Sequence, residues 1–386
     1  MSQGSDSTLE ATDSSPKSSL TPYEFFNRIG KPRYIVAPMV DHSDLSYRML
    51  TRKYGAELAY TQMFSSNCFV QSAELRSQLF TTCPEDRPLI VQFCGNNPET
   101  LLAAARMVED RCDAVDINLG CPQGIAKRGH YGAFLMEELE LLISIVSTLS
   151  KGLRVPVTCK TRIYRNDFER SVKLCETLVD AGASMLTIHG RSREEKGNLV
   201  ADCDWTMIAR LKAHFGDRIP IIANGGIECL DDVHRCMIET RVDGVMTSEA
   251  ILENPALFTR NLDQNNEYRT LVDLAGEKCH QSIHPIFAFC DYPYQLTRNI
   301  PFFHNFFVLS SSLFAEEYLN FCRKYPGAHI KSVRSHLMKF FYKYFLKHPD
   351  LRERAASTNS YDGFEEIILE MKSRVVDDSE YDEVRS

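Results

Sequence analysis

The 386-residue sequence lacks any run of about 18 consecutive apolar residues, the length that a membrane-spanning helix requires. Its first twenty residues are rich in serine. They have neither the apolar core of a secretory signal peptide nor the arginines of a mitochondrial presequence. We therefore predict a disordered tail over residues 1–22, no membrane partner, and a protein of the cytoplasm that can also enter the nucleus.

The sequence also lacks a CxxC motif, although it contains 13 cysteines. Several of them lie inside apolar runs, such as Cys94 and Cys159. An odd number of cysteines in such positions is typical of reduced, buried thiols rather than of disulfides or a zinc site, so we predict no metal. The net charge of −8 excludes a uniformly basic nucleic-acid-binding protein, but it allows a local basic face.

Between residues 33 and 258, short apolar runs alternate with amphipathic segments. The apolar runs are 33–39, 58–63, 88–93, 114–119, 155–161, 184–189, 220–224 and 244–248. Continuous apolar strands that alternate with helices are typical of a parallel sheet covered by helices. Eight such units predict an α/β fold of the closed (β/α)8 barrel type, a TIM barrel, over residues 23–262. The alternative is a doubly wound open sheet, but the GxGxxG motif expected after its first strand is absent.

Each predicted strand ends in or just before a residue that could serve a site. These residues are Met39, Met63, Gln92, Asn118, Lys160, His189, Asn224 and Ser248. Barrel enzymes build their sites at the carboxyl ends of the strands. The pattern across all eight strands therefore predicts one reactive face.

Two segments at the last strands are candidates for a phosphate site. Asn224 is followed by Gly225 and Gly226, and Ser248 is followed by Glu249. Glycines allow backbone N–H groups to approach an anion, and barrels commonly hold phosphate here. The alternative is two tight turns. Glu249 would have to point away from a bound phosphate.

Lys160 ends a buried apolar strand, where a lysine is costly unless it meets an anion. A structural salt bridge is one interpretation. The other is a cation beside the N1–C2=O edge of a flavin ring, which gains negative charge on reduction. In that case His189 and Gln92 would bind the polar edge of the ring, and the backbone at Pro38 and Met39 would support its face.

Cys121 follows the fourth strand on a loop with three glycines and two basic residues, which predicts a mobile, electropositive segment. A thiol on such a loop is accessible enough to react. Its neighbours do not match a cysteine-protease signature. A positioned thiol can instead act as a general acid.

The segments APMVDHSDLSYR, DINLGCPQGIAKRGHYGAFL, CKTR, TIHGR and ANGGI together resemble the tRNA-dihydrouridine synthase family. The resemblance runs from about Arg33 to Phe258 and resumes near the carboxyl end. The stretches KRGHYGA and CPEDRPLIVQF resemble the eukaryotic branch that acts on D-loop uridines 16 and 17. One departure is that Ser248 and Glu249 stand where many bacterial members carry Gly-Arg.

The resemblance implies FMN as cofactor, NADPH or NADH as reductant and tRNA as substrate. Hydride would go from the reduced flavin to C6 of uracil, and Cys121 would donate a proton to C5. Asn118 and Lys160 would position the base and the flavin, Arg162 would contact the nucleotide, and His189 would assist at the pyrimidine edge. Rival interpretations are a flavin barrel acting on a free pyrimidine or an enone, and a tRNA-binding protein that has lost activity.

Residues 320–354 contain nine Lys and Arg but only two Asp and Glu, with apolar residues at helical spacing. This pattern predicts an amphipathic helix with a basic face. The resemblance implies a helical tRNA-binding domain over 263–354, with Lys331, Arg334 and Lys339 as RNA contacts. Residues 355–386 are predicted to form a helix and an acidic tail, and the protein to be a monomer.

Residues 276–315 do not fit that domain. They are rich in Phe, Pro and His, show no clear period and interrupt an otherwise continuous helical pattern. We interpret them as an insertion, either a genuine lineage-specific one or a retained intron.

Overall fold

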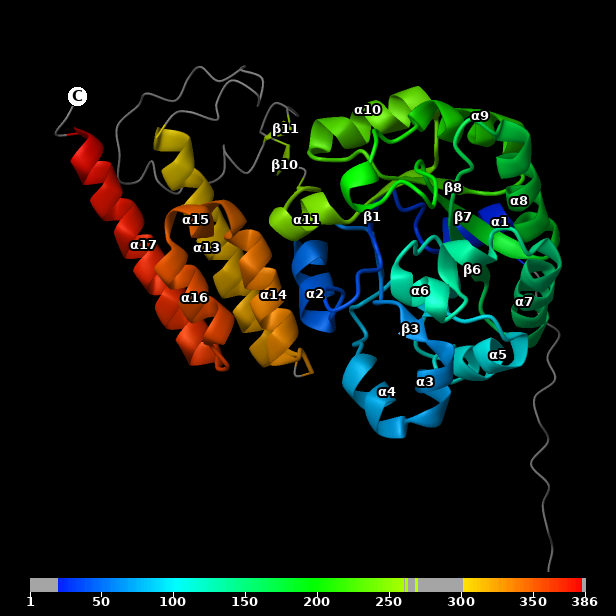
Figure 1. Ribbon diagram of the computed structural model, residues 1–386, viewed down its shortest axis with the longest axis horizontal. Helices are drawn as coiled ribbons and strands as arrows, with labels where there is room; N and C mark the ends of the chain where they lie inside the picture. Colours follow the sequence, from blue (N-terminus) through cyan, green and yellow to red (C-terminus); the bar gives the residue numbers. More distant parts are fainter. Residues whose placement is uncertain (1–19, 260, 263–267, 270–300, 326, 384–386) are drawn as a thin grey trace, which may run out of the picture.

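The computed structural model describes residues 20–259, 261–262, 268–269, 301–325 and 327–383 (Figure 1). Eight parallel strands form its centre: β1 (Tyr34–Val36), β2 (Leu58–Tyr60), β4 (Leu89–Cys94), β5 (Ala114–Leu119), β6 (Val157–Arg162), β7 (Ala183–His189), β8 (Ile221–Asn224) and β9 (Gly244–Thr247). β1 pairs with both β2 and β9, and β2 pairs with β4, so the sheet closes on itself. The predicted barrel is confirmed, and all eight apolar runs contain a strand. A short extra strand, β3 (Phe64–Ser65), pairs in parallel with the carboxyl end of β4 and had not been predicted.

Helices surround the barrel because each connecting segment has one apolar face. The main ones are α1 (Pro22–Arg28), α2 (Leu45–Lys53), α5 (Pro98–Arg106), α7 (Leu139–Gly152), α8 (Phe168–Asp180), α9 (Trp205–Phe215), α10 (Leu230–Thr240) and α11 (Glu249–Glu253). In α8, Val172, Cys175 and Leu178 recur at helical spacing and are buried. Asp167 begins this helix by accepting a hydrogen bond from the N–H of Arg170. Two further short helices, α3 (Ser66–Gln71) and α4 (Ala73–Leu79), project from the barrel after β3 (Figure 1).

A second, all-helical part lies beside the barrel, next to α2 and α11 (Figure 1). It consists of α13 (Pro301–Lys324), α14 (Ile330–Phe340), α15 (Tyr342–Lys347), α16 (Pro349–Ser357) and α17 (Tyr361–Glu383). Of the apolar residues at helical spacing on α14, Val333, Leu337 and Phe340 are buried and Ile330 is half-buried. Between the two parts, β10 (Asn261–Leu262) pairs with β11 (Tyr268–Arg269).

Three segments that the sequence marked as unusual lie partly outside the described residues. The predicted tail falls outside as far as residue 19, and α1 begins at Pro22. Residues 276–300 of the insertion fall outside as well, whereas residues 301–315 form the first part of α13 and continue into 316–324 without a break. The predicted acidic tail is helical as far as Glu383.

Asp44 anchors the helical part to the barrel. Its carboxylate caps α2 by accepting a hydrogen bond from the N–H of Tyr47, in the first turn of that helix. It also accepts one from the hydroxyl of Tyr318 on α13, and both are 3.0 Å long. A third comes from Nε2 of the fully buried His336 on α14, at 3.1 Å. Burial raises the pKa of Asp44, but the interactions with His336, Tyr47 and Tyr318 outweigh it, and the pKa is lower than usual. One carboxylate therefore joins three helices.

We expect Asp44→Ala to lower the free energy of unfolding by about 3 kcal/mol, because it removes a helix cap and leaves two buried donors unpaired. Urea denaturation measures this. Since the pKa of Asp44 is lower in the folded state, the wild-type protein should lose the contribution as the pH falls below about 4. Asp41→Asn, which breaks only the exposed pair with Lys331, should change stability by less than about 1 kcal/mol. Equal effects of the two substitutions would contradict the anchoring role.

Candidate active site

Backbone pairing brings the predicted strand-end residues together at the carboxyl face of the barrel. Asn118 on β5 is in register with Lys160 on β6. On the next two strands, His189 on β7 is in register with Arg162 on one side and Asn224 on the other. Residues that are distant in the sequence therefore form one continuous row around the barrel.

Asn118 binds the backbone of residues 120–122, which we call the Cys121 segment. The side-chain Oδ1 of Asn118 accepts hydrogen bonds from the N–H of Cys121 at 2.9 Å and from that of Gly120 at 3.2 Å. Cys121 is half-buried. A reactive thiol with a fixed backbone can face a substrate with little loss of conformational entropy.

The carbonyl groups of this segment are also held, each by a different element. Arg162 on β6 donates from Nε to the carbonyl oxygen of Gly120 at 2.7 Å. The N–H of Ala133 donates to the carbonyl oxygen of Cys121 at 3.1 Å. Nζ of Lys196 donates to the carbonyl oxygen of Pro122 at 2.6 Å. The carbonyl oxygens of residues 120, 121 and 122 thus each accept a hydrogen bond.

The residues after Cys121 fold into α6 (Gly124–Arg128) and the 3-10 helix η1 (Gly132–Leu135). The segment expected to be a loop is thus partly helical, and hydrogen bonds hold the backbone around its cysteine. The basic residues Lys127 and Arg128 remain exposed on α6, which keeps the segment electropositive.

Lys160 lies at the centre of the row and donates a hydrogen bond from Nζ to Oδ1 of Asn224 at 2.7 Å. Burial, followed by the nearby charge of Arg162, lowers the pKa of Lys160 to about 8. Among the described residues, no carboxylate forms an ion pair with Lys160, so the salt-bridge interpretation gains no support. The buried carboxylate of Asp116 attracts the ammonium and raises its pKa, but it forms no ion pair with Lys160. The ammonium can therefore bind an anionic ligand.

His189 is neutral in this environment. Burial and the charges of Lys160, Arg162 and Arg191 place its pKa well below the usual value. Arg191 donates to Nε2 of His189 at 3.3 Å, and because an arginine can only donate, Nε2 is the acceptor and the proton resides on Nδ1. The imidazole therefore offers one N–H donor for a ligand or a neighbouring group.

Gly225 and Gly226 form a tight turn after β8, with φ of +99° and +75°. A Cβ on Gly225 would lie 2.8 Å from the ring of His189, and one on Gly226 would lie 2.9 Å from Cβ of Cys203. The indole of Trp205 donates to the carbonyl oxygen of Gly225 at 3.0 Å. The turn thus requires glycine at both positions.

The remaining predicted cofactor residues also lie at this end of the barrel. Pro38 and Met39 follow β1, and the N–H of Met39 donates to Oγ of Ser43 at 2.9 Å. Ser248 precedes α11, and Glu249, its first residue, is exposed, as a site for phosphate would require. Gln92 is fully buried on β4, in register with Asp116 one layer below the site. Its amide already binds Asp116 and Asn118, so the structure gives no support to the predicted contact with the edge of the flavin ring.

The three predicted RNA-contacting residues lie on α14, in the helical part, and differ in what they touch. Lys331 is exposed and reaches Asp41 on the barrel at 3.3 Å. Lys339 is half-buried on the same helix. Arg334 donates instead to the carbonyl oxygen of Thr358, between α16 and α17, at 2.7 Å, so part of its guanidinium holds the helical part together.

Sequence reasoning missed several residues that shape the site. Asp116, Arg191 and Lys196 all contact predicted site residues or their backbone. Asp116 could have been found, because it precedes Asn118 by two residues and alternate residues of a strand share a face. Arg191 and Lys196 lie in a loop, whose course the sequence does not indicate. In the part of the chain that the structure describes, no helix is long and apolar enough to cross a membrane, and no group of His, Cys, Asp and Glu could hold a metal.

We expect Gly225→Ala to destabilise the protein by about 2 kcal/mol and to displace the ring of His189, because both the backbone angle and the space exclude a Cβ. Thermal denaturation measures the first effect, and the histidine NMR signals report the second. Gly216→Ala is the matched control, since its φ is +53° but no atom lies within 4 Å of the added Cβ. The turn would not be essential if Gly225→Ala left the His189 signals unchanged.

The fold and the site define a (β/α)8-barrel protein that gathers a thiol, a buried cation and a neutral imidazole at the carboxyl ends of its strands. A family profile described as dihydrouridine synthase matches residues 35–290. The chain belongs to the dihydrouridine synthase family.

Three relatives carry the name tRNA-dihydrouridine(16/17) synthase. The Mus musculus protein, whose name ends in "-like", is 38% identical over 92% of this chain and 65% of its own length. The Saccharomyces cerevisiae protein is 47% identical over 67% of this chain and 62% of its own length. The Schizosaccharomyces pombe protein is 35% identical over 94% of this chain and 83% of its own length. The chain thus spans less than two thirds of the length of the first two relatives.

Proposed function

We propose that the protein is a flavin-dependent enzyme that reduces uridine in tRNA to 5,6-dihydrouridine, at D-loop positions 16 and 17. The observation that carries the proposal is the thiol of the half-buried Cys121, on a backbone fixed by Asn118, at the same barrel end as Lys160. The names of the relatives support the substrate and the position.

The residues present fit FMN as the cofactor. Lys160 supplies a cation without a carboxylate partner for the N1–C2=O edge of the ring, and neutral His189 supplies a donor. The turn at Gly225 and Gly226 and the residues at Ser248 lie where barrels commonly bind phosphate. When bound and reduced by NADPH or NADH, the flavin would supply the hydride that goes to C6 of the uracil.

Cys121 completes the reduction by donating its thiol proton to C5 of the uracil. One hydride at C6 and one proton at C5 saturate the C5–C6 double bond, and the thiolate that remains takes a proton from solvent. The target base must leave its stack to reach the barrel, and unpaired D-loop bases do so at low cost.

The direct test is to purify the protein, measure bound FMN by its absorbance, and assay dihydrouridine in tRNA with NADPH. We expect Cys121→Ala to bind FMN as the wild type does but to lose at least about 99% of the product, because general acid catalysis typically contributes a factor of 10²–10⁴. Cys68→Ala, which removes an exposed thiol on α3, should retain activity.

Wild-type product levels from Cys121→Ala would remove the thiol from the mechanism. Reduction of free uracil or of an enone, but not of tRNA, would favour a flavin barrel with a small substrate. A protein that binds tRNA but neither FMN nor NADPH would favour the inactive binding protein.

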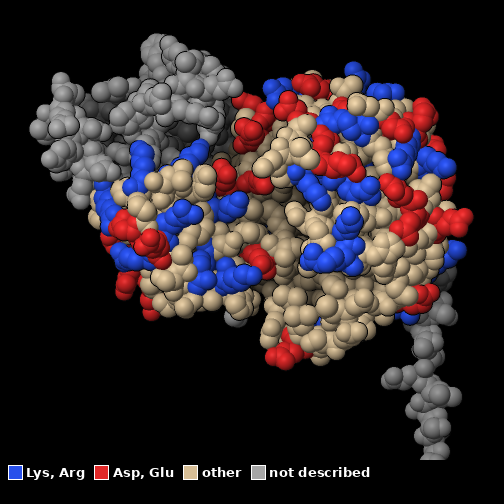
Figure 2. Space-filling view, viewed as in Figure 1, with Lys and Arg blue, Asp and Glu red and all other residues tan. Residues whose placement is uncertain are grey.

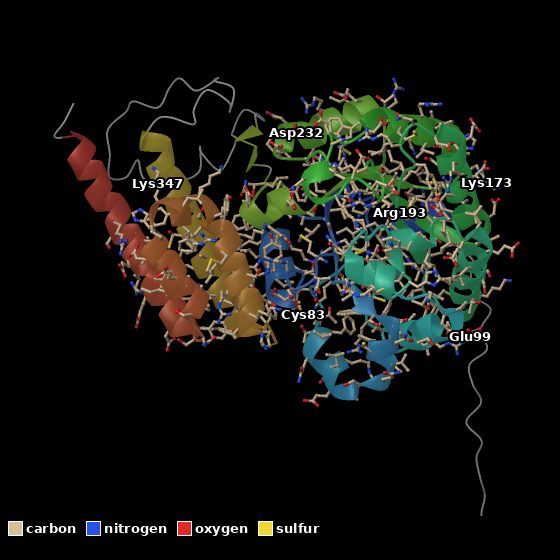
Figure 3. The ribbon with its side chains drawn as sticks, in the orientation of Figure 1. Cys83, Glu99, Lys173, Arg193, Asp232 and Lys347 are labelled. Atoms are coloured by element: carbon tan, nitrogen blue, oxygen red, sulfur yellow. The ribbon has the colours of Figure 1, made fainter. Side chains whose placement is uncertain are left out.

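We expect the affinity for FMN to fall about tenfold as the pH rises from 7 to 9.5. The pKa of Lys160 is about 8 before the ligand binds, so the ammonium is present below this pH and lost above it. Titration by flavin fluorescence measures the affinity. Lys160→Met should bind more weakly at pH 7 and show a flatter pH profile, whereas Lys173→Met, on the outer helix α8, should match the wild type (Figure 3). A wild-type profile that is flat over this range would contradict the assignment.

We propose that tRNA lies across the surface between the barrel and the helical part. Figure 2 shows Lys and Arg on both sides of a hollowed, mostly uncharged surface there. Exposed Lys127 and Arg128 lie on α6, close in sequence to Cys121, and Lys331 lies on α14. Cations at such positions can bind RNA phosphates on either side of an inserted base. We further propose that the protein acts as a monomer in the cytoplasm and also in the nucleus.

A further inference from the structure

Asp116 is a fully buried carboxylate inside the barrel, one layer below the site. Its Oδ1 accepts a hydrogen bond from the hydroxyl of Thr158 at 2.6 Å, and its Oδ2 accepts one from Nε2 of Gln92 at 2.8 Å. Burial raises the pKa of Asp116 to about 6, so the group is still ionised at neutral pH. Nothing in the proposed reaction uses this carboxylate directly.

The hydrogen bond from Gln92 is the first link of a chain that ends at the reactive cysteine. Because Nε2 of Gln92 faces Asp116, its Oε1 is left to accept a hydrogen bond from Nδ2 of Asn118 at 3.0 Å. Because Nδ2 of Asn118 is used there, its Oδ1 faces the N–H groups of Gly120 and Cys121. Each amide therefore takes its direction from the one before it.

The direction of the chain is set at both ends, by the carboxylate of Asp116 and by the N–H groups of Gly120 and Cys121, which can only donate. An amide side chain can turn over and exchange its oxygen and nitrogen, but an ionised carboxylate can only accept hydrogen bonds. Facing Asp116, Gln92 must present its NH₂ group, and the order of donors and acceptors then follows as far as Cys121. If Gln92 turned over, Asn118 would have to turn as well, and an NH₂ group would then face two backbone N–H groups.

We propose that Asp116 is a positioning residue that fixes the backbone at Cys121 through the amides of Gln92 and Asn118. This role goes beyond the proposed function, and only its consequence for the rate rests on that function. The carboxylate holds the directions of the two amides, the amides hold the N–H groups of residues 120 and 121, and the thiol keeps one place relative to its substrate.

Hydrogen–deuterium exchange of the peptide that covers residues 119–123 tests the structural part without any activity assay. We expect Asp116→Leu to accelerate exchange at Gly120 and Cys121 about tenfold, because their acceptor is no longer held in place. Asp116→Asn should exchange like the wild type. Its oxygen can accept from Gln92 while its NH₂ group donates to Thr158, and that orientation preserves both hydrogen bonds at Asn118.

The matched control is Thr158→Val. It removes the other buried hydrogen bond to the same carboxylate but leaves the chain through Gln92 intact, so the exchange of residues 120 and 121 should not change. In an Asn118→Ala background, Asp116→Leu should cause no further acceleration, since the link is already cut. If Asp116→Leu does not fold, Gln92→Met cuts the chain one residue later and carries the same test.

Dihydrouridine formation supplies the functional readout. For Asp116→Leu we expect kcat to fall about tenfold or more with little change in KM for tRNA, and for Asp116→Asn we expect kcat within about threefold of the wild type. Wild-type exchange in Asp116→Leu, or equal acceleration in Thr158→Val, overturns the proposal. If the wild-type protein forms no dihydrouridine, the proposed function fails, while the exchange experiment still decides the role of Asp116.

Discussion

The closed ladder of backbone hydrogen bonds around the eight strands is the constraint on which the rest of the structure depends. It sets Asn118 beside Lys160, and His189 between Arg162 and Asn224. Because side chains alternate along a strand, the register also decides which of them face the barrel interior. Asp116 and Asn118 share the inner face of β5 for this reason, one below the other, and the chain of amides between them follows from that geometry.

The electrostatics of the site follow from how its cations are held. Lys160, Arg162 and Arg191 form no ion pair with a carboxylate among the residues described, and they bind amide, imidazole or carbonyl groups instead. Outside the site, by contrast, the buried Arg48 is paired with the carboxylate of Asp86. Unpaired cations lower the pKa of their neighbours, including His189, and leave net positive potential where an anion would bind.

The Cys121 segment and the helical part are positioned by the same kind of interaction. In each, one buried polar side chain collects hydrogen bonds from several elements: Asn118 from the backbone after β5, and Asp44 from α2, α13 and α14. Such groups are costly to bury unless they are fully satisfied, so they fix relative positions more sharply than apolar packing does. Arg193, which is labelled in Figure 3, places its guanidinium 5.2 Å from the ring centre of Phe134 in η1.

The sequence by itself determined the strands and the barrel, because continuous apolar runs and intervening amphipathic segments depend on local composition. It also determined which strand ends carry reactive groups, since each of these groups lies at or next to the end of a run. Only the tertiary structure decided how the groups act together. Asp116 and Lys196 reach their partners through space, and Arg334 holds Thr358 instead of remaining free. Cys121 was predicted to be reactive from its position after β5, but the fold fixed its backbone. The five hydrogen bonds that hold residues 120–122 come from residues that lie far apart in the sequence as well as from its own neighbours, and a linear pattern cannot show which of them meet.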